Sequence, residues 1–191
     1  MLVTLFWILI VLIGIGLVFF AYWIVLLTRY PEPVLVDEVH TVTTPDIWKI
    51  RLYRLKPARG GGEPVLLCHG MGSNRLNFLL PEDHSLAHAL SQHGYDCWMI
   101  DLRGCRSSKP PFGRSATEIT VEDHVVGDLP AALKHIRQVT GFEKVHWVGH
   151  SMGGMLLYAY ELLHGNDWIA SGVTLASPPG FEGVVYKSYS T

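Results

Sequence analysis

One serine stands in a setting that suits a nucleophile. Residues 149–153 read Gly-His-Ser-Met-Gly, between a run of strand-forming residues and a run of helix-forming residues. A sharp strand-to-helix turn would expose the serine hydroxyl, and the two glycines would remove side chains that clash across that turn. We therefore predict that Ser151 is a catalytic nucleophile, supported by Gly149, His150 and Gly153. The alternative is an ordinary glycine-rich turn in which the serine only caps the helix.

A second glycine-containing loop follows another apolar run, at Cys68-His69-Gly70-Met71-Gly72-Ser73. Acyl transfer places negative charge on a carbonyl oxygen, which two backbone N–H groups can stabilise. We predict that these donors are the N–H groups of Met71 and Met152, with His69 and Gly70 supporting the loop. The alternative is an ordinary turn without a role in chemistry.

A serine hydroxyl also needs a base that takes its proton. The only histidine after Ser151 is His164, about 13 residues further along an expected helix. That distance is about 20 Å along a helix, whereas a hydrogen bond spans about 3 Å. His164 is therefore excluded if the helix is continuous. His150 is adjacent to the serine, and its side chain is expected to point to the opposite side.

The elements that must position these residues are short apolar strands that alternate with helical patterns. Such alternation is typical of βαβ units and of a mostly parallel sheet with helices on both faces. An antiparallel hairpin precedes them, with strands expected at 34–43 and 47–55. The expected later strands are 65–68, 95–102, 145–148 and 173–176, with helices near 86–90, from Thr120 through Ile136, and at 152–163. Thr120 and Asp123 approximate a capping box.

Several segments together resemble the α/β-hydrolase superfamily: VLLCHGMGS, GYDCWMIDLRGCRSS, DLPAAL and KVHWVGHSMGG, in this order and spacing. The earlier VHTVTTPDIWKIRLYRLKP resembles the leading hairpin of acid-lipase-like members. The resemblance runs from about residue 36 to residue 179, and it implies about six strands of an α/β-hydrolase sheet and an esterase or lipase activity. A serine at position 151 argues against epoxide hydrolases and dehalogenases, which use aspartate.

One loop departs from that family. Members often carry Asp-x-x-Gly-x-Gly-x-Ser after the fourth strand, commonly with His before the second Gly, whereas DLRGCRSS has Cys105 and Arg106 in these two places. This loop should border the site. We expect Cys105 to be an unreactive thiol.

In the family the acid and the histidine of the triad follow later strands, in the chain order Ser, Asp or Glu, His. The present chain ends at Thr191, soon after the expected strand 173–176, and its last residues resemble the start of a lid. We therefore expect both residues beyond Thr191, a hydrolase domain that is incomplete at its C-terminus, and a chain nearly inactive by itself. Glu182 is a poor alternative acid.

Residues 2–28 contain no charged side chain, and a helix of about 20 apolar residues spans a bilayer. A signal peptide would need a basic start and a small-residue cleavage site, and a buried core helix of this length would be unusual. We predict a transmembrane anchor at 1–28, a linker at 29–35 and the hydrolase domain at 36–191. Arg29 and the later cations favour a cytoplasmic domain, and three cysteines suit a reducing compartment.

The resulting hypothesis is a membrane-anchored serine hydrolase that cleaves carboxylic esters of a lipid-like kind through an acyl-enzyme on Ser151. This chemistry requires no metal and no cofactor, and a net charge of −2 argues against a nucleic-acid partner. Two alternatives stay open: a non-catalytic hydrolase-like binding or scaffold protein, and an acyltransferase that uses the same serine.

Overall fold

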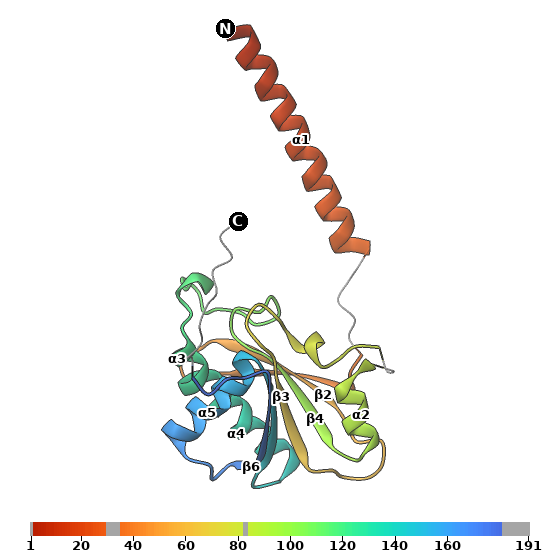
Figure 1. Ribbon diagram of the computed structural model, residues 1–191, viewed down its shortest axis with the longest axis vertical. Coiled ribbons are helices and arrows are strands. Elements are labelled where there is room, and N and C mark those ends of the chain that lie inside the picture. Colours follow the sequence, from red (N-terminus) through yellow and green to blue (C-terminus); the bar gives the residue numbers. More distant parts are fainter. Residues whose placement is uncertain (1, 30–34, 82–83, 181–191) are drawn as a thin grey trace. The chain divides into compact units, whose positions relative to one another are not determined.

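The chain forms two compact units, Met1–Leu35 and Val36–Thr191. The computed structural model describes residues 2–29, 35–81 and 84–180 (Figure 1). In the first unit, α1 (Leu2–Arg29) is a single 28-residue helix. Its segment Thr4–Leu26 is long and apolar enough to cross a membrane, judged by length and composition. Glu182 and the rest of the expected lid segment lie outside the described residues.

The second unit is built on one six-stranded sheet in the order β1-β2-β4-β3-β5-β6. β1 pairs antiparallel with β2, β2 pairs antiparallel with β4, and the remaining neighbours are parallel. This arrangement confirms the expected leading hairpin and mostly parallel sheet. The strands are β1 (Glu38–Thr43), β2 (Lys49–Leu55), β3 (Pro64–Cys68), β4 (Asp96–Asp101), β5 (Val145–His150) and β6 (Ile169–Leu175).

Helices cover both faces of this sheet (Figure 1). Buried side chains alternate along β3, so that Leu66 packs with α4 and α5 on one face, while Leu67 packs beside α2 on the other. Continuous apolar strands are expected when both faces are covered. The helices are α2 (Leu86–Gln92), α3 (Val121–Asp123), α4 (Leu129–Thr140) and α5 (Met152–His164), with short 3₁₀ turns at Arg75–Asn77 and Ala116–Glu118.

The helix expected from Thr120 is not continuous. The capping box is confirmed, because the side chain of Thr120 accepts from the Asp123 N–H while Asp123 accepts from the Thr120 N–H. After α3, however, residues His124–Asp128 form a π-helical turn before α4 begins. A π turn inserts an extra residue into the helix and frequently marks a functional region.

Several strand boundaries also differ from expectation. β1 begins at Glu38 rather than at residue 34. β2 begins at Lys49 rather than at residue 47, because Ile47 has a left-handed φ of 67° and belongs to the turn. β6 begins at Ile169 rather than at residue 173. Its first residues pair with β5 through a bulge, so backbone pairing rather than side-chain propensity extends the strand.

Candidate active site

Ser151 occupies the sharp turn between β5 and α5. Its φ of 52° and ψ of −119° lie in a region that residues other than glycine rarely adopt. Three backbone hydrogen bonds hold this conformation: the Ser151 N–H donates to Leu175 O at 2.8 Å, and Ser151 O accepts from Gly154 N at 3.1 Å and Met155 N at 3.2 Å. The surrounding structure therefore fixes the backbone of the serine.

Steric constraints explain why glycine occupies the positions on each side of Ser151. A Cβ on Gly149 would lie 2.4 Å from Gly153 O, across the turn. A Cβ on Gly153 would lie 2.0 Å from Cys68 O, at the end of β3. Gly149 thus permits the tight turn, and Gly153 permits α5 to pack against the neighbouring strand.

The loop after β3 reaches the serine, as the sequence predicted. A Cβ added to Gly70 would lie 3.0 Å from Ser151 Cβ and 3.2 Å from His150 O. Met152 is the first residue of α5, where a backbone N–H has no acceptor within the helix. Among the described residues, no backbone carbonyl accepts a hydrogen bond from the N–H of Met152 or of Met71.

The side chain of His69 supports this loop through hydrogen bonds. It is 3% exposed, its Nδ1 lies 2.7 Å from Gly70 O, and its Nε2 lies 3.3 Å from Leu102 N. An Nδ1–H donor and an Nε2 acceptor satisfy both contacts. Burial lowers the pKa of His69, which favours this neutral imidazole near pH 7.

His150 and His164 form no hydrogen bond with the Ser151 hydroxyl in the described part of the chain. His150 Nδ1 is buried near Gly70 and has no hydrogen-bond partner in the described part of the chain. His164 ends α5, where its Nε2 lies 3.1 Å from Val125 O and its ring packs on Tyr160. The continuous helix thus keeps His164 away from the turn, and no described histidine is hydrogen-bonded to Ser151.

The family model described as alpha/beta hydrolase fold matches residues 63–186. This match covers more than half of the sequence. The chain belongs to the α/β-hydrolase family.

The relatives of this α/β hydrolase include several lipases. It is 38% identical to Lipase 1 of Drosophila melanogaster over 123 residues, which is 61% of this chain and 28% of the relative. It is 34% identical to Triacylglycerol lipase 2 of Arabidopsis thaliana, over 64% of this chain and 32% of the relative. It also matches gastric triacylglycerol lipase of Rattus norvegicus at 33% identity, over 60% of this chain and 32% of the relative. The chain thus spans about a third of the length of these curated relatives.

Solved structures support the fold. An esterase from Exiguobacterium antarcticum superposes with a TM-score of 0.55 at 24% identity, covering 70% of this chain and 43% of the esterase. A Vigna radiata epoxide hydrolase mutant gives a TM-score of 0.54 at 23% identity, covering 74% and 39%. Because esterases and epoxide hydrolases both match, the fold alone does not select the reaction of this α/β hydrolase.

A buried ionic network behind the site was not anticipated. Arg75 donates to Asp101 through its backbone N–H at 2.7 Å and its Nη1 at 3.0 Å. Arg103 Nε donates to Asp128 at 2.8 Å, and its Nη1 and Nη2 donate to Asp46 at 2.8 and 3.0 Å. Asp101 and Arg103 of the DLRG segment lie at the carboxyl end of the buried strand β4, a position where polar residues hold neighbouring loops in α/β sheets.

Cys105, in the loop that departs from the family pattern, lies against His69. Its Sγ is 3.3 Å from His69 Nε2 and 3.5 Å from Ser73 O, and the residue is half-buried. His69, Asp101 and Cys105 also offer three atoms that could ligate a metal ion. The sequence indicated that this loop borders the site, but it did not indicate the contact with His69.

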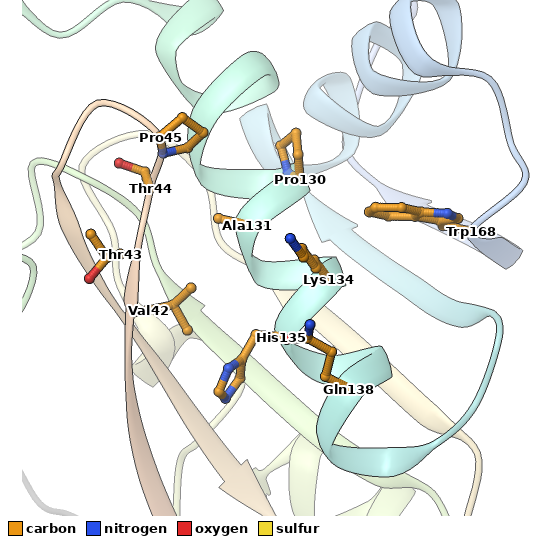
Figure 2. Close-up of a pocket in the computed structure, with 10 residues that line it drawn as sticks. All are labelled: Val42, Thr43, Thr44, Pro45, Pro130, Ala131, Lys134, His135, Gln138 and Trp168. Atoms are coloured by element: carbon orange, nitrogen blue, oxygen red, sulfur yellow. The ribbon is translucent and has the colours of Figure 1, made fainter.

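A separate pocket of about 450 Å³ lies between the end of β1 and α4. Figure 2 shows Val42, Thr44 and Pro45 on one side, with Lys134, His135 and Trp168 on the other. Its lining includes no residue of the turn at Ser151 or of the His69 loop. This pocket is therefore distinct from the candidate active site.

Proposed function

We propose that this α/β hydrolase is a membrane-anchored serine hydrolase that cleaves carboxylic esters through an acyl-enzyme on Ser151. The observation that carries the proposal is the conformation of Ser151. A non-glycine residue is held at φ 52° between β5 and α5, with Gly70 of the neighbouring loop against it. Strained positions of this kind cluster at active sites, and a strand-to-helix turn is where family members carry their nucleophile.

In the proposed first step, Ser151 Oγ attacks the carbonyl carbon of the ester while a base accepts its proton. The carbonyl oxygen becomes negatively charged and is stabilised by the N–H groups of Met71 and Met152. The alcohol leaves with a proton from the base, and the acyl group remains on Oγ. Water then attacks the acyl-enzyme, releases the acid and restores the serine.

His69 contributes to this step by position rather than by proton transfer. Its Nδ1–H donates to the Gly70 carbonyl, so it fixes the orientation of the peptide between Gly70 and Met71, which carries the proposed Met71 donor. Preorganised donors stabilise an oxyanion better than mobile ones because they need no reorganisation during the reaction.

The mechanism requires a base that the described residues do not supply to Ser151. His164 Nε2 is hydrogen-bonded to Val125 O at the far end of α5, and the ring nitrogens of His69 contact Gly70 O and Leu102 N rather than Ser151. We therefore expect the 191-residue chain to form an acyl-enzyme slowly and to turn over esters poorly.

A lipid-like ester is the substrate class that we favour. The relatives from Drosophila, Arabidopsis and rat all carry the name lipase, and two are named for triacylglycerol. An apolar helix at Thr4–Leu26 would hold the domain at a membrane, where such esters are concentrated. We propose that α1 is this anchor, and that the domain faces the cytoplasm because Arg29 and the later cations follow it.

The substrate class can be tested with p-nitrophenyl esters of short and long acyl chains, using the full chain in detergent micelles. We expect weak hydrolysis that increases with acyl length and is absent in Ser151→Ala. Hydrolysis that persists in Ser151→Ala would contradict the proposal. Transfer of the acyl group to an added alcohol instead of water would favour an acyltransferase, and this product analysis is made on the same samples.

A further inference from the structure

We propose that Cys105, His69 and Asp101 form a binding site for a thiophilic divalent cation such as Zn²⁺, beside the Ser151 turn. One candidate ligand atom from each residue lies within 4.8 Å of the other two. Two of the residues are buried and Cys105 is half-buried, so the group lies largely inside the protein. No step of the ester chemistry proposed for Ser151 involves this ion.

The distance between Cys105 and His69 suits a shared metal ion. Zn–S bonds of about 2.3 Å and Zn–N bonds of about 2.0–2.1 Å in a tetrahedral arrangement separate sulfur and nitrogen by about 3.6 Å. Cys105 Sγ and His69 Nε2 are 3.3 Å apart. A cation between them would therefore require a shift of only a few tenths of an ångström.

The orientation of His69 also suits a ligand. Its Nδ1 bonds Gly70 O at 2.7 Å, which leaves the Nε2 lone pair directed toward Cys105. Histidine ligands commonly donate their other ring N–H to a carbonyl or carboxylate, which fixes the ring and its tautomer. The competing contact from Leu102 N to Nε2 is long, at 3.3 Å.

Asp101 supplies the third ligand, which is the oxygen donor of the group. Its Oδ1 accepts from Arg75 N, and its Oδ2 accepts from Arg75 Nη1 and from the Ser107 hydroxyl. The two oxygens of a carboxylate can accept about four interactions, so a carboxylate with these three donors can still bind a metal. With three protein ligands, a tetrahedral ion would keep its fourth position for a water molecule.

The donor set selects the kind of cation. Thiolate and imidazole together favour Zn²⁺ and similar ions, whereas Mg²⁺ and Ca²⁺ prefer sites made only of oxygen. Binding breaks the S–H bond of Cys105, releases that proton to water and forms a metal–sulfur bond. The bound ion would join Cys105 to the His69 ring that braces Gly70 beside Ser151.

The site can be tested by titrating the full chain in detergent with Co²⁺, which reports a thiolate ligand through a sulfur-to-metal charge-transfer band. We expect a saturable band with one ion per chain in the wild type and in Cys97→Ser, whose thiol lies in β4 away from the site. Cys105→Ser should lose the band and bind at least tenfold more weakly. An unchanged band in Cys105→Ser, or no saturable band in the wild type, would overturn the proposal.

A second measurement needs no variant. Iodoacetamide alkylation of Cys105 in the wild-type chain is followed by peptide mass spectrometry with and without Zn²⁺. We expect Zn²⁺ to slow the alkylation at least tenfold and Mg²⁺ to leave it unchanged. Equal alkylation rates with and without Zn²⁺ would show that Cys105 is not a ligand.

Discussion

At the scale of single residues, Ser151 has a strained backbone and lies in the sharp turn between β5 and α5. Its left-handed backbone costs about 1–3 kcal/mol, and glycine would adopt the same conformation without that cost. We predict that Ser151→Gly is more stable than Ser151→Ala by about 1 kcal/mol and therefore unfolds at a higher temperature. Both variants lose the hydroxyl, and only glycine relieves the strain. Thermal unfolding followed by circular dichroism measures the difference. A lower stability for Ser151→Gly would contradict the account of strain.

Gly153 gives a second prediction at this scale. Gly153→Ala should destabilise the domain by about 1–3 kcal/mol, because the new Cβ would meet Cys68 O at 2.0 Å. The same change at Gly61 is a matched control, since no atom lies within 4 Å of a Cβ there. Denaturant unfolding of both variants tests the prediction, and equal stabilities would contradict it.

The candidate site was predictable from sequence where its signals are local. Ser151 and its glycines stand within five residues of one another, so their spacing alone indicated the turn. The Arg103–Asp128 pair was not predictable in this way, because 25 residues separate its members and only the folded sheet brings them together. The contact between Cys105 and His69 is hidden for the same reason.

At the scale of elements, the π turn at His124–Asp128 supports the loop that follows β4. Asp128, at the end of that turn, is fully buried and accepts from both the backbone N–H and Nε of Arg103. A Cβ on Gly127 would lie 2.4 Å from Arg103 Nη2, so the turn also leaves room for the guanidinium. The interruption of the helix therefore has a structural use.

This arrangement predicts that Arg103→Ala destabilises the domain by about 3–5 kcal/mol, because it removes the guanidinium that pairs with the buried carboxylate of Asp128. Arg106→Ala is the matched control, since Arg106 is an exposed arginine of the same loop. Urea unfolding should show a small change for Arg106→Ala, within about 0.5 kcal/mol. A similar loss for both variants would mean that the network does not stabilise the loop.

The leading hairpin contributes to the stability of the fold in a way that depends on pH. Hydrogen bonds from Lys56 and Arg54 lower the pKa of Glu38 from 4.5 to about 2. A carboxylate whose pKa is lowered by folding stabilises the folded state at pH values above its pKa in the unfolded chain. This stabilisation is lost as the pH falls from about 4.5 toward 2. We predict that Glu38→Gln lowers the unfolding temperature at about pH 6 and that the difference shrinks near pH 3. A difference that is constant with pH would contradict this role.

Element types were easier to predict than their limits. The order of strands and helices followed from apolar periodicity, and the structure confirms it. The π turn was not predicted because the helical periodicity of apolar residues continues through it. The contact of Asp128 with Arg103, which accompanies the turn, forms only in the folded domain. The start of β6 was missed because Ala170, Ser171 and Gly172 are weak strand formers that pair through the backbone.

At the scale of the whole molecule, an apolar helix precedes a hydrolase domain in the same chain. If α1 spans the membrane, the chain should remain in the pellet after alkaline carbonate extraction, and removal of residues 1–28 should release it. A cytoplasmic domain should be digested by protease added outside sealed microsomes. Full release of the intact chain by carbonate would exclude the anchor, and protection from the protease would reverse the orientation.

The central claim is that Ser151 is the nucleophile and that His164 is not its base. The most direct measurement is the reaction of the folded chain with a fluorophosphonate probe, with the adduct located by peptide mass spectrometry. We predict slow formation of a single adduct on Ser151, none in Ser151→Ala, and an unchanged rate in His164→Ala. Equal labelling of Ser151→Ala, or no adduct on Ser151 in the wild type, would contradict the claim.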